Sequence, residues 1–389
     1  MKITDVRVAM FSCPIPLERQ HHTDLGQAVK AEAAVVEVRT DEGLTGIGPA
    51  FGSPPAIQAL VEQEFRDLVI GEDPCAPERL WERMYAGSRW PLSERAGYSF
   101  PRVQRRGESL AAISGIDVAC WDIAGKALGV PIHRLLGGGA RARIPAYASG
   151  GWAPRDRIGD ELLGYVGRGF QAVKMRLWGD HPFELREAVA RVAAARTALG
   201  DGRDLMVDAH GALGLPMAVR VAEQLVPLAV RWFEEPVSPD DHAGYRQLRG
   251  RVPVGLAAGE NEVTRFPFVG LLADGGLDVL QPDVAVVGGI TEARRVAVLA
   301  HAYHRLCIPH VWHSGLIVAA SLQLAAGAPN CPIFEVPMSR NPLIWELTTP
   351  EIRVENGEVT VPCGPGLGVD LVPDAARMYP YIPGPMYRQ

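Results

Sequence analysis

The middle of the chain alternates short apolar runs, rich in β-branched residues, with longer amphipathic stretches. This alternation starts near residue 144, in RIPAYAS, and continues to FEVP at 334–337. Each repeat has the length of one strand, one loop and one helix, which is typical of consecutive βα units. We therefore predict that residues 141–340 form a parallel α/β barrel, whose functional groups follow the carboxyl ends of the strands.

Residues 1–140 carry a different pattern. Strand-like alternation up to about residue 50 predicts antiparallel strands, with residues 33–40 and 44–50 joined at an Asp41-Glu42-Gly43 turn. Helical periodicity follows, and the predicted helices span residues 56–69, 76–87 and 109–128. We expect residues 1–140 to form an α+β capping domain.

Two segments are less regular. Residues 88–108 are rich in arginine, and Arg102, Arg105 and Arg106 fit either a solvated charge cluster or a clamp for a distal carboxylate. Residues 341–389 contain a hairpin that turns at Asn356-Gly357. We expect this C-terminal tail to return to the cap and complete it.

Composition narrows the classes of protein. The 389 residues carry a net charge of −6, so no basic field for nucleic acid is present. No apolar run reaches membrane-spanning length, and the N-terminus begins as a strand without the features of a signal peptide. We expect a cytoplasmic enzyme, assembled as a homo-oligomer, with no nucleic-acid or membrane partner. The scattered cysteines indicate free thiols.

Three acidic residues occur at equal intervals in the predicted barrel. Asp208 follows MV, Glu234 follows RWF and Glu260 follows GLAAG, and the step from the first acid to the second equals the step from the second to the third. Each step has the length of one βα repeat, so the three carboxylates should meet at the same end of the barrel. Mutual repulsion would then require a cation, and an all-oxygen donor set favours Mg²⁺.

Further ionisable residues occur at the ends of the neighbouring predicted strands. Lys174 and Arg176 are two apart, so both side chains should point to the same side of their strand. Asp283, His310 and Glu335 continue the series downstream at nearly the same interval. Consecutive strand ends thus each carry a charged or titratable group, which is a pattern expected of an active site.

The motifs resemble those of the enolase superfamily, in the mandelate racemase and muconate lactonizing enzyme family and its acid-sugar (galactonate-type) dehydratase branch. The resemblance covers nearly the whole chain, and the motifs that carry it are SGIDVACWDIAGKALGVPIHRLLGG, KxR, DAHG, FEEP, GEN, QPD with GGIT, PHVW and PCGPGLGVDL. It implies a modified TIM barrel, (β/α)7β, with an α+β N-terminal cap that the C-terminal tail completes.

The resemblance also implies roles for these residues. By it, Asp208, Glu234 and Glu260 bind Mg²⁺, and His310 paired with Asp283 is the base. Glu335 and Lys174 correspond to the groups that stabilise a substrate carboxylate as it becomes an enediolate. Such stabilisation is needed because a proton α to a carboxylate is too weakly acidic for an unaided side chain.

Two residues favour a dehydratase acting on a small sugar acid. His210 resembles the histidine of galactonate-type dehydratases that assists departure of the 3-hydroxyl, although a plain substrate-binding role is an alternative. Arg176 occupies the place where racemases of this group have a second lysine, and an arginine is a poor base. One-base chemistry favours elimination of water from a 2,3-dihydroxy acid, giving a 2-keto-3-deoxy acid. Arg176 could instead bind a substrate oxygen or carboxylate.

Alternatives remain open from the sequence. His313 in PHVWH competes with His310 for the role of base, and spacing favours His310. A cycloisomerase or epimerase of a sugar acid or its lactone would use the same metal and the same enediolate. A barrel retained for binding alone is disfavoured, because none of the nine site groups is missing.

Overall fold

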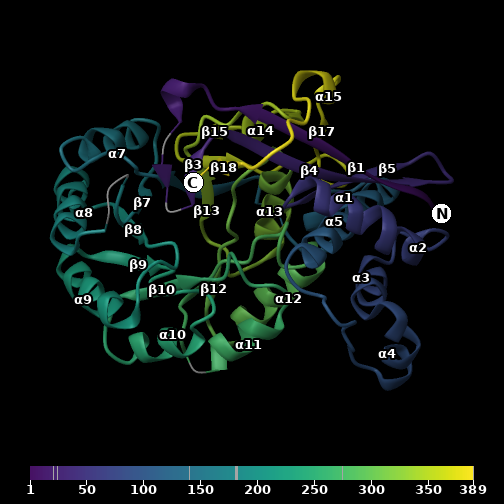
Figure 1. Cartoon of the computed structure of the whole chain (residues 1–389), viewed down its shortest axis with the longest axis horizontal. Coiled ribbons are helices and arrows are strands. Elements are labelled where there is room, and N and C mark those ends of the chain that lie inside the picture. The colour runs from purple at the N-terminus through teal and green to yellow at the C-terminus, as the bar shows by residue number, and fades with distance from the viewer. Residues whose placement is uncertain (21, 24, 140, 180–182, 274, 389) are drawn as a thin grey trace.

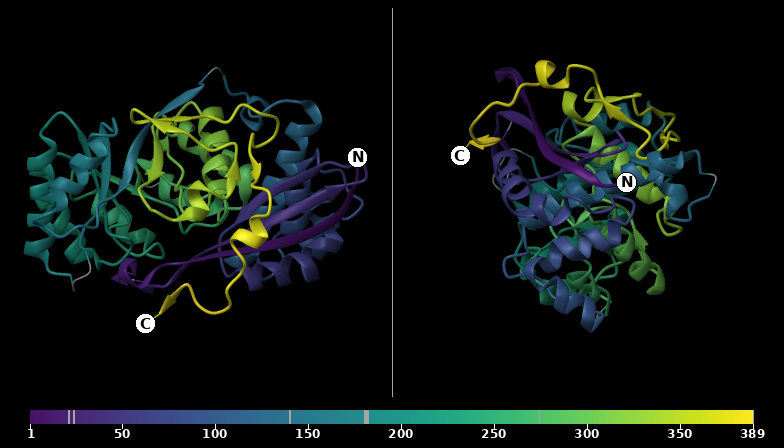
Figure 2. Two further views of the ribbon diagram at one scale, coloured as in Figure 1. Left: turned by 90° about the horizontal axis from the view of Figure 1, so that it is seen from above. Right: turned by 90° about the vertical axis from the view of Figure 1, so that its right-hand side faces the viewer.

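The structure is a computed structural model that describes residues 1–20, 22–23, 25–139, 141–179, 183–273 and 275–388. Figure 1 shows two parts of the molecule. A ring of strands and helices lies on the left, and an antiparallel sheet with its own helices lies on the upper right. The ring contains the middle of the chain, and the sheet contains the N-terminal residues. The C-terminal segment runs over both parts, as the two views of Figure 2 show.

The barrel domain follows the predicted order of elements. Its parallel strands are β6 (Arg143–Gly150), β7 (Ala172–Arg176), β8 (Asp204–Asp208), β9 (Val230–Glu234), β10 (Gly255–Ala258), β11 (Val279–Leu280), β12 (Leu306–Cys307) and β13 (Phe334–Pro337). The connecting helices are α7 (Ile158–Val166), α8 (Leu185–Leu199), α9 (Leu215–Leu225), α10 (His242–Arg249), α11 (Phe266–Ala273), α12 (Gly289–Ala302) and α13 (Gly315–Gly327). Pairing runs without interruption from β12 through β6 to β13. Within the described residues this is the (β/α)7β order, so the predicted fold class is confirmed.

A layer of apolar side chains fills the barrel below the site. One buried cluster draws a residue from each strand or from its end: Tyr147, Ala172, Met206, Trp232, Ala257, Val279, Ile308 and Ile333. Side chains of a strand alternate between its two faces, so the residue two positions later points the same way. Lys174, Asp208 and Glu234 each come two residues after a member of this cluster. The next layer towards the carboxyl ends of the strands is therefore charged.

The cap is built on an antiparallel sheet. Strands β1 (Ile3–Pro14), β4 (Lys30–Thr40) and β5 (Thr45–Ala50) pair in the order β1-β4-β5. The long helix α5 (Glu108–Leu128) packs against β5, where Gly46 and Gly48 allow the two backbones to approach closely. A Cβ atom at Gly48 would lie 2.1 Å from the carbonyl oxygen of Gly115. The cap sheet and α5 thus share one tightly packed core.

The other cap elements are short. They are the 3-10 segment Leu17–Arg19, β2 (His22–Thr23), β3 (Gly26–Ala28), α1 (Pro54–Leu60), the π segment Val61–Phe65, α2 (Arg66–Val69), α3 (Pro77–Ala86), the 3-10 segment Gly87–Arg89, α4 (Trp90–Ala96) and α6 (Ile132–Leu135). Helix α4 lies in the segment that the sequence predicted to be irregular. It begins with Pro91 in its first turn and ends at Gly97, which has the left-handed conformation of a C-terminal cap.

The C-terminal tail returns to the cap, as the sequence predicted, and it also contacts the barrel. The hairpin of β15 (Val354–Glu355) and β16 (Glu358–Thr360) turns at Asn356-Gly357 as expected, but β16 pairs with β6 of the barrel. The last strand, β18 (Tyr387–Arg388), pairs with β3 of the cap. The remaining tail elements are α14 (Pro342–Trp345), β14 (Thr348–Thr349), β17 (Asp370–Leu371) and α15 (Ala375–Met378).

Two expectations from composition can be compared with the structure. All six cysteines are free thiols, as predicted. Among the helices that the structure describes, none combines the length and the apolar character needed to cross a bilayer.

Candidate active site

A cavity of about 590 Å³ lies where the cap meets the carboxyl ends of the barrel strands. Cap residues such as Lys30 and Phe51 line one side, and residues that follow the barrel strands line the other. The predicted site residues that reach its surface are Lys174, Arg176, Asp208, His210, Glu260, Asp283 and His310. Glu234 and Glu335, the other two, are fully buried.

Lys174 connects the cavity to these two buried acids. Its Nζ is paired with Glu234 and lies 2.8 Å from Oε1 of Glu335. Burial alone would lower the pKa of Lys174, but the charges of Glu234 and Glu335 outweigh it and hold the pKa well above its usual value. Lys174 is therefore a permanent cation at the cavity surface.

Two side chains of the barrel interior hold the carboxylate of Glu234 in place. Its Oε2 accepts hydrogen bonds from the amide of Gln281 at 2.7 Å and from the indole of Trp232 at 3.1 Å. Burial raises its pKa to about 7; Lys174 opposes this rise and the nearby carboxylate of Asp208 adds to it. Sequence reasoning did not single out Gln281 or Trp232, although both flank predicted site residues.

Asp208 is opposite Glu234 in the register of β8 and β9. Its Oδ2 lies 2.9 Å from the guanidinium of Arg176, and its Oδ1 accepts the backbone N–H of His210 at 2.8 Å. Burial would raise the pKa of Asp208, but Arg176 and Lys174 lower it below its usual value. Lys174 and Arg176 thus each pair with one of the two adjacent acids, Glu234 and Asp208 respectively.

His310 and Asp283 lie together as the sequence predicted. Nδ1 of His310 is 2.8 Å from Oδ2 of Asp283, whose other oxygen accepts the N–H of Ala285 at 2.7 Å. The other ring nitrogen, Nε2, lies 3.6 Å from Oε2 of Glu260. Burial lowers the pKa of His310, but Glu260 and Asp283 dominate and raise it to about 10.

His210 approaches Glu260 from the other side. Its Nε2 lies 3.6 Å from Oε1 of Glu260, the oxygen that His310 does not face. The backbone of His210 has a positive φ of 49°, an unusual conformation for a non-glycine residue that directs the chain after β8. Two imidazoles thus flank one carboxylate in the same cavity.

Glu335 is positioned behind Lys174. One oxygen accepts the N–H of Val311 at 2.8 Å, and the other faces Lys174 and the indole of Trp312 at 3.3 Å. Burial would raise the pKa of Glu335, but Lys174 outweighs it and lowers the pKa below its usual range. Glu335 is fully buried, and its contact with Lys174 holds that cation in place beside the cavity.

His313, the competing histidine, is in a different setting. Its ring stacks on Phe51 with 3.8 Å between the ring centroids. Burial and the neighbouring His310 lower the pKa of His313 to about 3. His313 lines the cavity through an aromatic stack, whereas His310 has a carboxylate partner that can orient it as a base.

The arginines of residues 88–108 lie away from this cavity. Arg105 is buried in the cap, where it contacts Glu64, Ser109 and the carbonyl of Met84. Arg102 is paired with the same Glu64. Neither predicted role describes Arg105, because its guanidinium is buried in the cap, where it pairs with Glu64, and is neither solvated nor beside the cavity.

The chemistry of the acids fits a divalent cation. Asp208, Glu234 and Glu260 supply hard oxygen donors from three neighbouring strands, and the mutual repulsion of these acids contributes to the raised pKa of Glu234. As their side chains stand, Lys174, Arg176 and the two histidines face these carboxylates. No group of three His, Cys, Asp or Glu side chains within the described part of the chain is spaced to hold one ion.

The fold and the cavity define an α/β-barrel enzyme with its acid–base groups under a separate cap. Residues 5–137 match the mandelate racemase / muconate lactonizing enzyme N-terminal domain, and residues 157–375 match the enolase C-terminal domain-like family. The chain therefore belongs to the mandelate racemase and muconate lactonizing enzyme family of the enolase superfamily. Membership of this superfamily generally implies a divalent metal.

Individual relatives are similar over nearly their full length. A D-galactarolactone cycloisomerase from Agrobacterium fabrum is 33% identical, with 96% of this chain and 98% of the relative covered. A D-galactonate dehydratase from Variovorax paradoxus is 34% identical, with 91% and 93% covered. The crystal structure of an enolase superfamily member from Polaromonas sp. JS666 has a TM-score of 0.89 and 34% identity, with 100% of both chains covered.

Proposed function

We propose that this protein is a Mg²⁺-dependent acid-sugar dehydratase, which converts a 2,3-dihydroxy acid to a 2-keto-3-deoxy acid. The observation that carries the proposal is the placement of His210 and His310 on the two oxygens of Glu260, each 3.6 Å away. Elimination of water needs one group to accept a proton from C2 and another to give a proton to the hydroxyl at C3. We assign the first role to His310 and the second to His210.

His310 would accept the C2 proton at Nε2, because Asp283 holds Nδ1 and fixes the orientation of the ring. The electrons of the C2–H bond then form the enediolate of the substrate carboxylate. They return to expel the 3-hydroxyl, which takes a proton from His210 and leaves as water. The resulting enol loses the proton of its C2 hydroxyl and gains one at C3, which gives the 2-keto-3-deoxy acid.

Lys174 would face the substrate carboxylate as it gains charge. Its pKa is held well above the usual value, so it remains an ammonium at any working pH. Glu335 keeps it in place through the 2.8 Å contact, which makes the site preorganised for the charge that develops. Arg176 stays protonated as well, so it serves as a cation for a substrate oxygen and not as a second base.

Asp208, Glu234 and Glu260 would hold the Mg²⁺. When bound, such an ion supplies positive charge for the enediolate and offsets the attraction that raises the pKa of His310. The donor chemistry and the surplus of carboxylates support this assignment.

The experiment that tests the proposal is a screen of aldonic and aldaric acids with Mg²⁺, with 2-keto acid detected by semicarbazide. A 2-keto product, together with exchange of the C2 proton in deuterated solvent, is the expected result. A product isomeric with its substrate would overturn it in favour of a cycloisomerase. That second candidate is favoured by the similarity to the D-galactarolactone cycloisomerase over 96% of this chain.

A further inference from the structure

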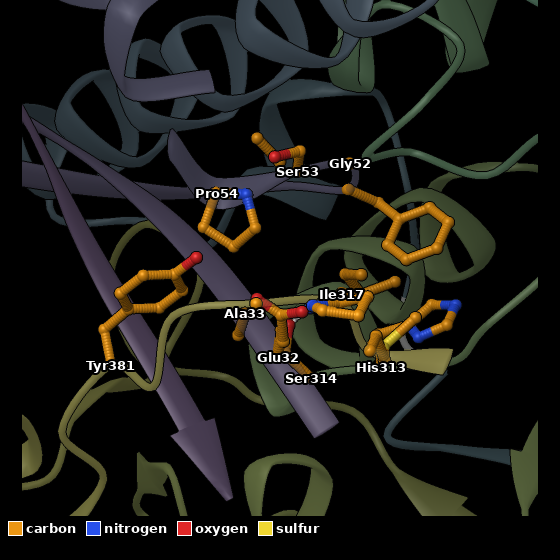
Figure 3. Close-up of a pocket in the computed structure, with 14 residues that line it drawn as sticks. Glu32, Ala33, Gly52, Ser53, Pro54, His313, Ser314, Ile317 and Tyr381 are labelled. Atoms are coloured by element: carbon orange, nitrogen blue, oxygen red, sulfur yellow. Dashed lines mark hydrogen bonds between the residues drawn. The ribbon is translucent and has the colours of Figure 1, made fainter. Parts of the chain in front are cut away.

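A second cavity, of about 230 Å³, adjoins the active cavity. Figure 3 shows that residues from four parts of the chain surround it: Glu32 on β4, Ser53 before α1, His313 before α13 and Tyr381 in the C-terminal segment. None of the nine proposed catalytic or metal-binding residues lines it. The reaction proposed above therefore leaves this cavity unexplained.

The two cavities share a wall. Phe51, His313 and Met386 line both, and the stacked rings of Phe51 and His313 form part of this boundary. An ion pair also bridges them, because Lys30 lines the active cavity, Glu32 lines the second cavity, and 3.2 Å separates Nζ from Oε1. A ligand in the active cavity whose far end passes this boundary would reach Glu32.

Glu32 has one carboxylate oxygen without a partner among the residues that the structure describes. Its side chain is only 9% exposed, and Oε1 is engaged by Lys30. Oε2 is buried and accepts no hydrogen bond from the described residues. A buried carboxylate oxygen normally has a donor, because an unsatisfied one costs about 1–3 kcal/mol or more. Because Glu32 lines the cavity, a small rotation of its side chain would present Oε2 to a ligand hydroxyl, which would supply the missing donor.

Three hydroxyl-bearing residues line the same space: Ser53, Tyr381 and Ser314, whose hydroxyl already accepts the N–H of Ile317. Ser53 precedes α1 as its N-cap, yet its side chain makes no capping hydrogen bond. Pro54 and Pro55 occupy the first two helical positions, so the usual N–H at the second position is missing. The hydroxyl of Tyr381 remains a neutral donor, because burial and the charge of Glu32 raise its pKa.

The charges around the cavity select a neutral ligand. Lys30 balances Glu32, and it is also engaged by the carbonyl of Ile382 and by the ring face of Tyr381 at 5.1 Å. A hydroxyl can donate to Oε2 of Glu32 at no electrostatic cost. A carboxylate at the same place would meet the like charge of Oε2 in a poorly solvated site.

We propose that the second cavity binds the hydroxylated end of a sugar monoacid, with Oε2 of Glu32 as acceptor, and that it discriminates against diacids. This inference rests on the proposed function, and it assigns the substrate class as long-chain aldonates. Glu32 is then a specificity-determining residue distant from the reacting carbons. Ser53 and Tyr381 are secondary contacts.

The test compares kcat/KM for a six-carbon aldonate, the matching aldarate and three-carbon glycerate in the wild type and in Glu32→Gln. Glutamine keeps the shape but removes the charge that repels a distal carboxylate. The aldonate-to-aldarate ratio should fall about tenfold or more, which corresponds to about 1.4 kcal/mol. Glycerate is too short to reach Glu32, so its kcat/KM should not change.

Controls keep the inference falsifiable. Glu37→Gln, at an acid on the same strand that pairs with Arg39, should leave all three substrates unchanged. If Glu32→Gln fails to fold, the double variant Ser53→Ala, Tyr381→Phe should still lower kcat/KM for the six-carbon aldonate severalfold while sparing glycerate. If Glu32→Gln folds and the wild type is active, an unchanged aldonate-to-aldarate ratio of kcat/KM overturns the proposed subsite. Wild type that acts on no acid and exchanges no C2 proton overturns the proposed function instead.

Discussion

At the scale of single residues, each proposed metal-binding acid lies beside a basic side chain. Lys174 pairs with Glu234, Arg176 with Asp208, and two histidines approach Glu260. A buried carboxylate without a counter-charge is expensive, so each acid takes the nearest cation. A bound metal cation would take the place of some of these cationic side chains beside the acids. A substrate carboxylate would take the place of some of the acids beside the cationic side chains.

The sequence predicted where these residues lie better than it predicted what they contact. Strand-end spacing placed Asp283 and His310 at the ends of consecutive strands, and the family resemblance paired them; their side chains are in contact. Spacing locates backbone positions and says little about side-chain direction. For that reason it could not reveal that Glu335 lies behind Lys174, or that Gln281 and Trp232 hold Glu234.

Glu234→Gln should weaken Mg²⁺ binding at least tenfold and abolish turnover, because it removes one of the three negative donors while keeping the shape of the side chain. Calorimetric titration of Mg²⁺ into EDTA-treated protein measures the first effect without reference to activity. Glu262→Gln, at an acid paired with His242, is the matched control and should bind Mg²⁺ normally. Full wild-type activity after proven removal of the metal would contradict the assignment.

His310→Asn should eliminate both exchange of the C2 proton with deuterated solvent and product formation, since Nε2 is the proposed proton acceptor. The comparison is His313→Asn, which alters a ring in the cavity wall and can weaken substrate binding, but should retain exchange at saturating substrate. Proton NMR of the substrate in D₂O follows both variants. If exchange survives in His310→Asn and disappears in His313→Asn, the base has been assigned to the wrong histidine.

His210→Asn should separate proton abstraction from loss of water. Lys174, Asp283 and His310 are untouched, so C2 exchange should continue, while 2-keto acid formation should fall by about 10² to 10⁴. Parallel measurement of exchange by NMR and of product by semicarbazide shows the difference. Dehydration at the wild-type rate would make His210 a bystander, and loss of both reactions would place it at the metal or in the role of base.

At the scale of elements, long periodic segments were predictable and short ones were not. Helix α5 and strands β4 and β5 followed from their hydrophobic period over many residues. Helix α4 is short, and Pro91 and Gly97 in its sequence are typical of irregular structure, whereas here they mark its two ends. The pairing of β16 with β6 is a long-range choice that no local pattern encodes.

The contact between β5 and α5 leads to a prediction about stability. Gly48→Ala would place a Cβ atom 2.1 Å from the carbonyl oxygen of Gly115, so the strand or helix must shift. Overpacking of this kind costs about 1–3 kcal/mol. The matched control is Gly164→Ala in α7, where a Cβ meets nothing within 4 Å and helix propensity should improve. Urea unfolding of both variants measures the difference, and an equal midpoint for both would contradict the tight packing.

At the scale of the whole molecule, α5 of the cap also joins the barrel. Asp117 on α5 is fully buried and accepts hydrogen bonds from the backbone N–H and the hydroxyl of Thr291 on α12. The indole of Trp121 donates to the same hydroxyl at 2.9 Å. The active cavity lies between cap and barrel, so contacts of this kind maintain its shape. Sequence patterns identified the two domains, but the polar contacts between them follow from packing of segments that are far apart in the chain.

This junction should make stability depend on pH. Burial raises the pKa of Asp117 to about 8 from an ordinary value of 3.8, and the hydrogen bonds from Thr291 oppose the rise only in part. A carboxyl group with a raised pKa in the folded state binds its proton more tightly when folded. Its contribution is therefore most favourable below pH 3.8, and stability is lost, by at most about 1.4 kcal/mol per pH unit, as the pH rises to about 8.

Asp117→Asn should remove this dependence, because asparagine cannot ionise yet can accept from the N–H of Thr291 and donate to its hydroxyl. The variant should gain stability relative to wild type as the pH rises from 5 to 8, and the gain should level off above about pH 8. Urea unfolding midpoints at several pH values measure the difference. Glu108→Gln, at an acid in the first turn of the same helix that accepts the N–H of Ser53, is the control for a general charge effect. A constant difference between Asp117→Asn and wild type across this range would show that Asp117 is ionised in the folded protein at every pH tested, and that the junction tolerates a buried charge.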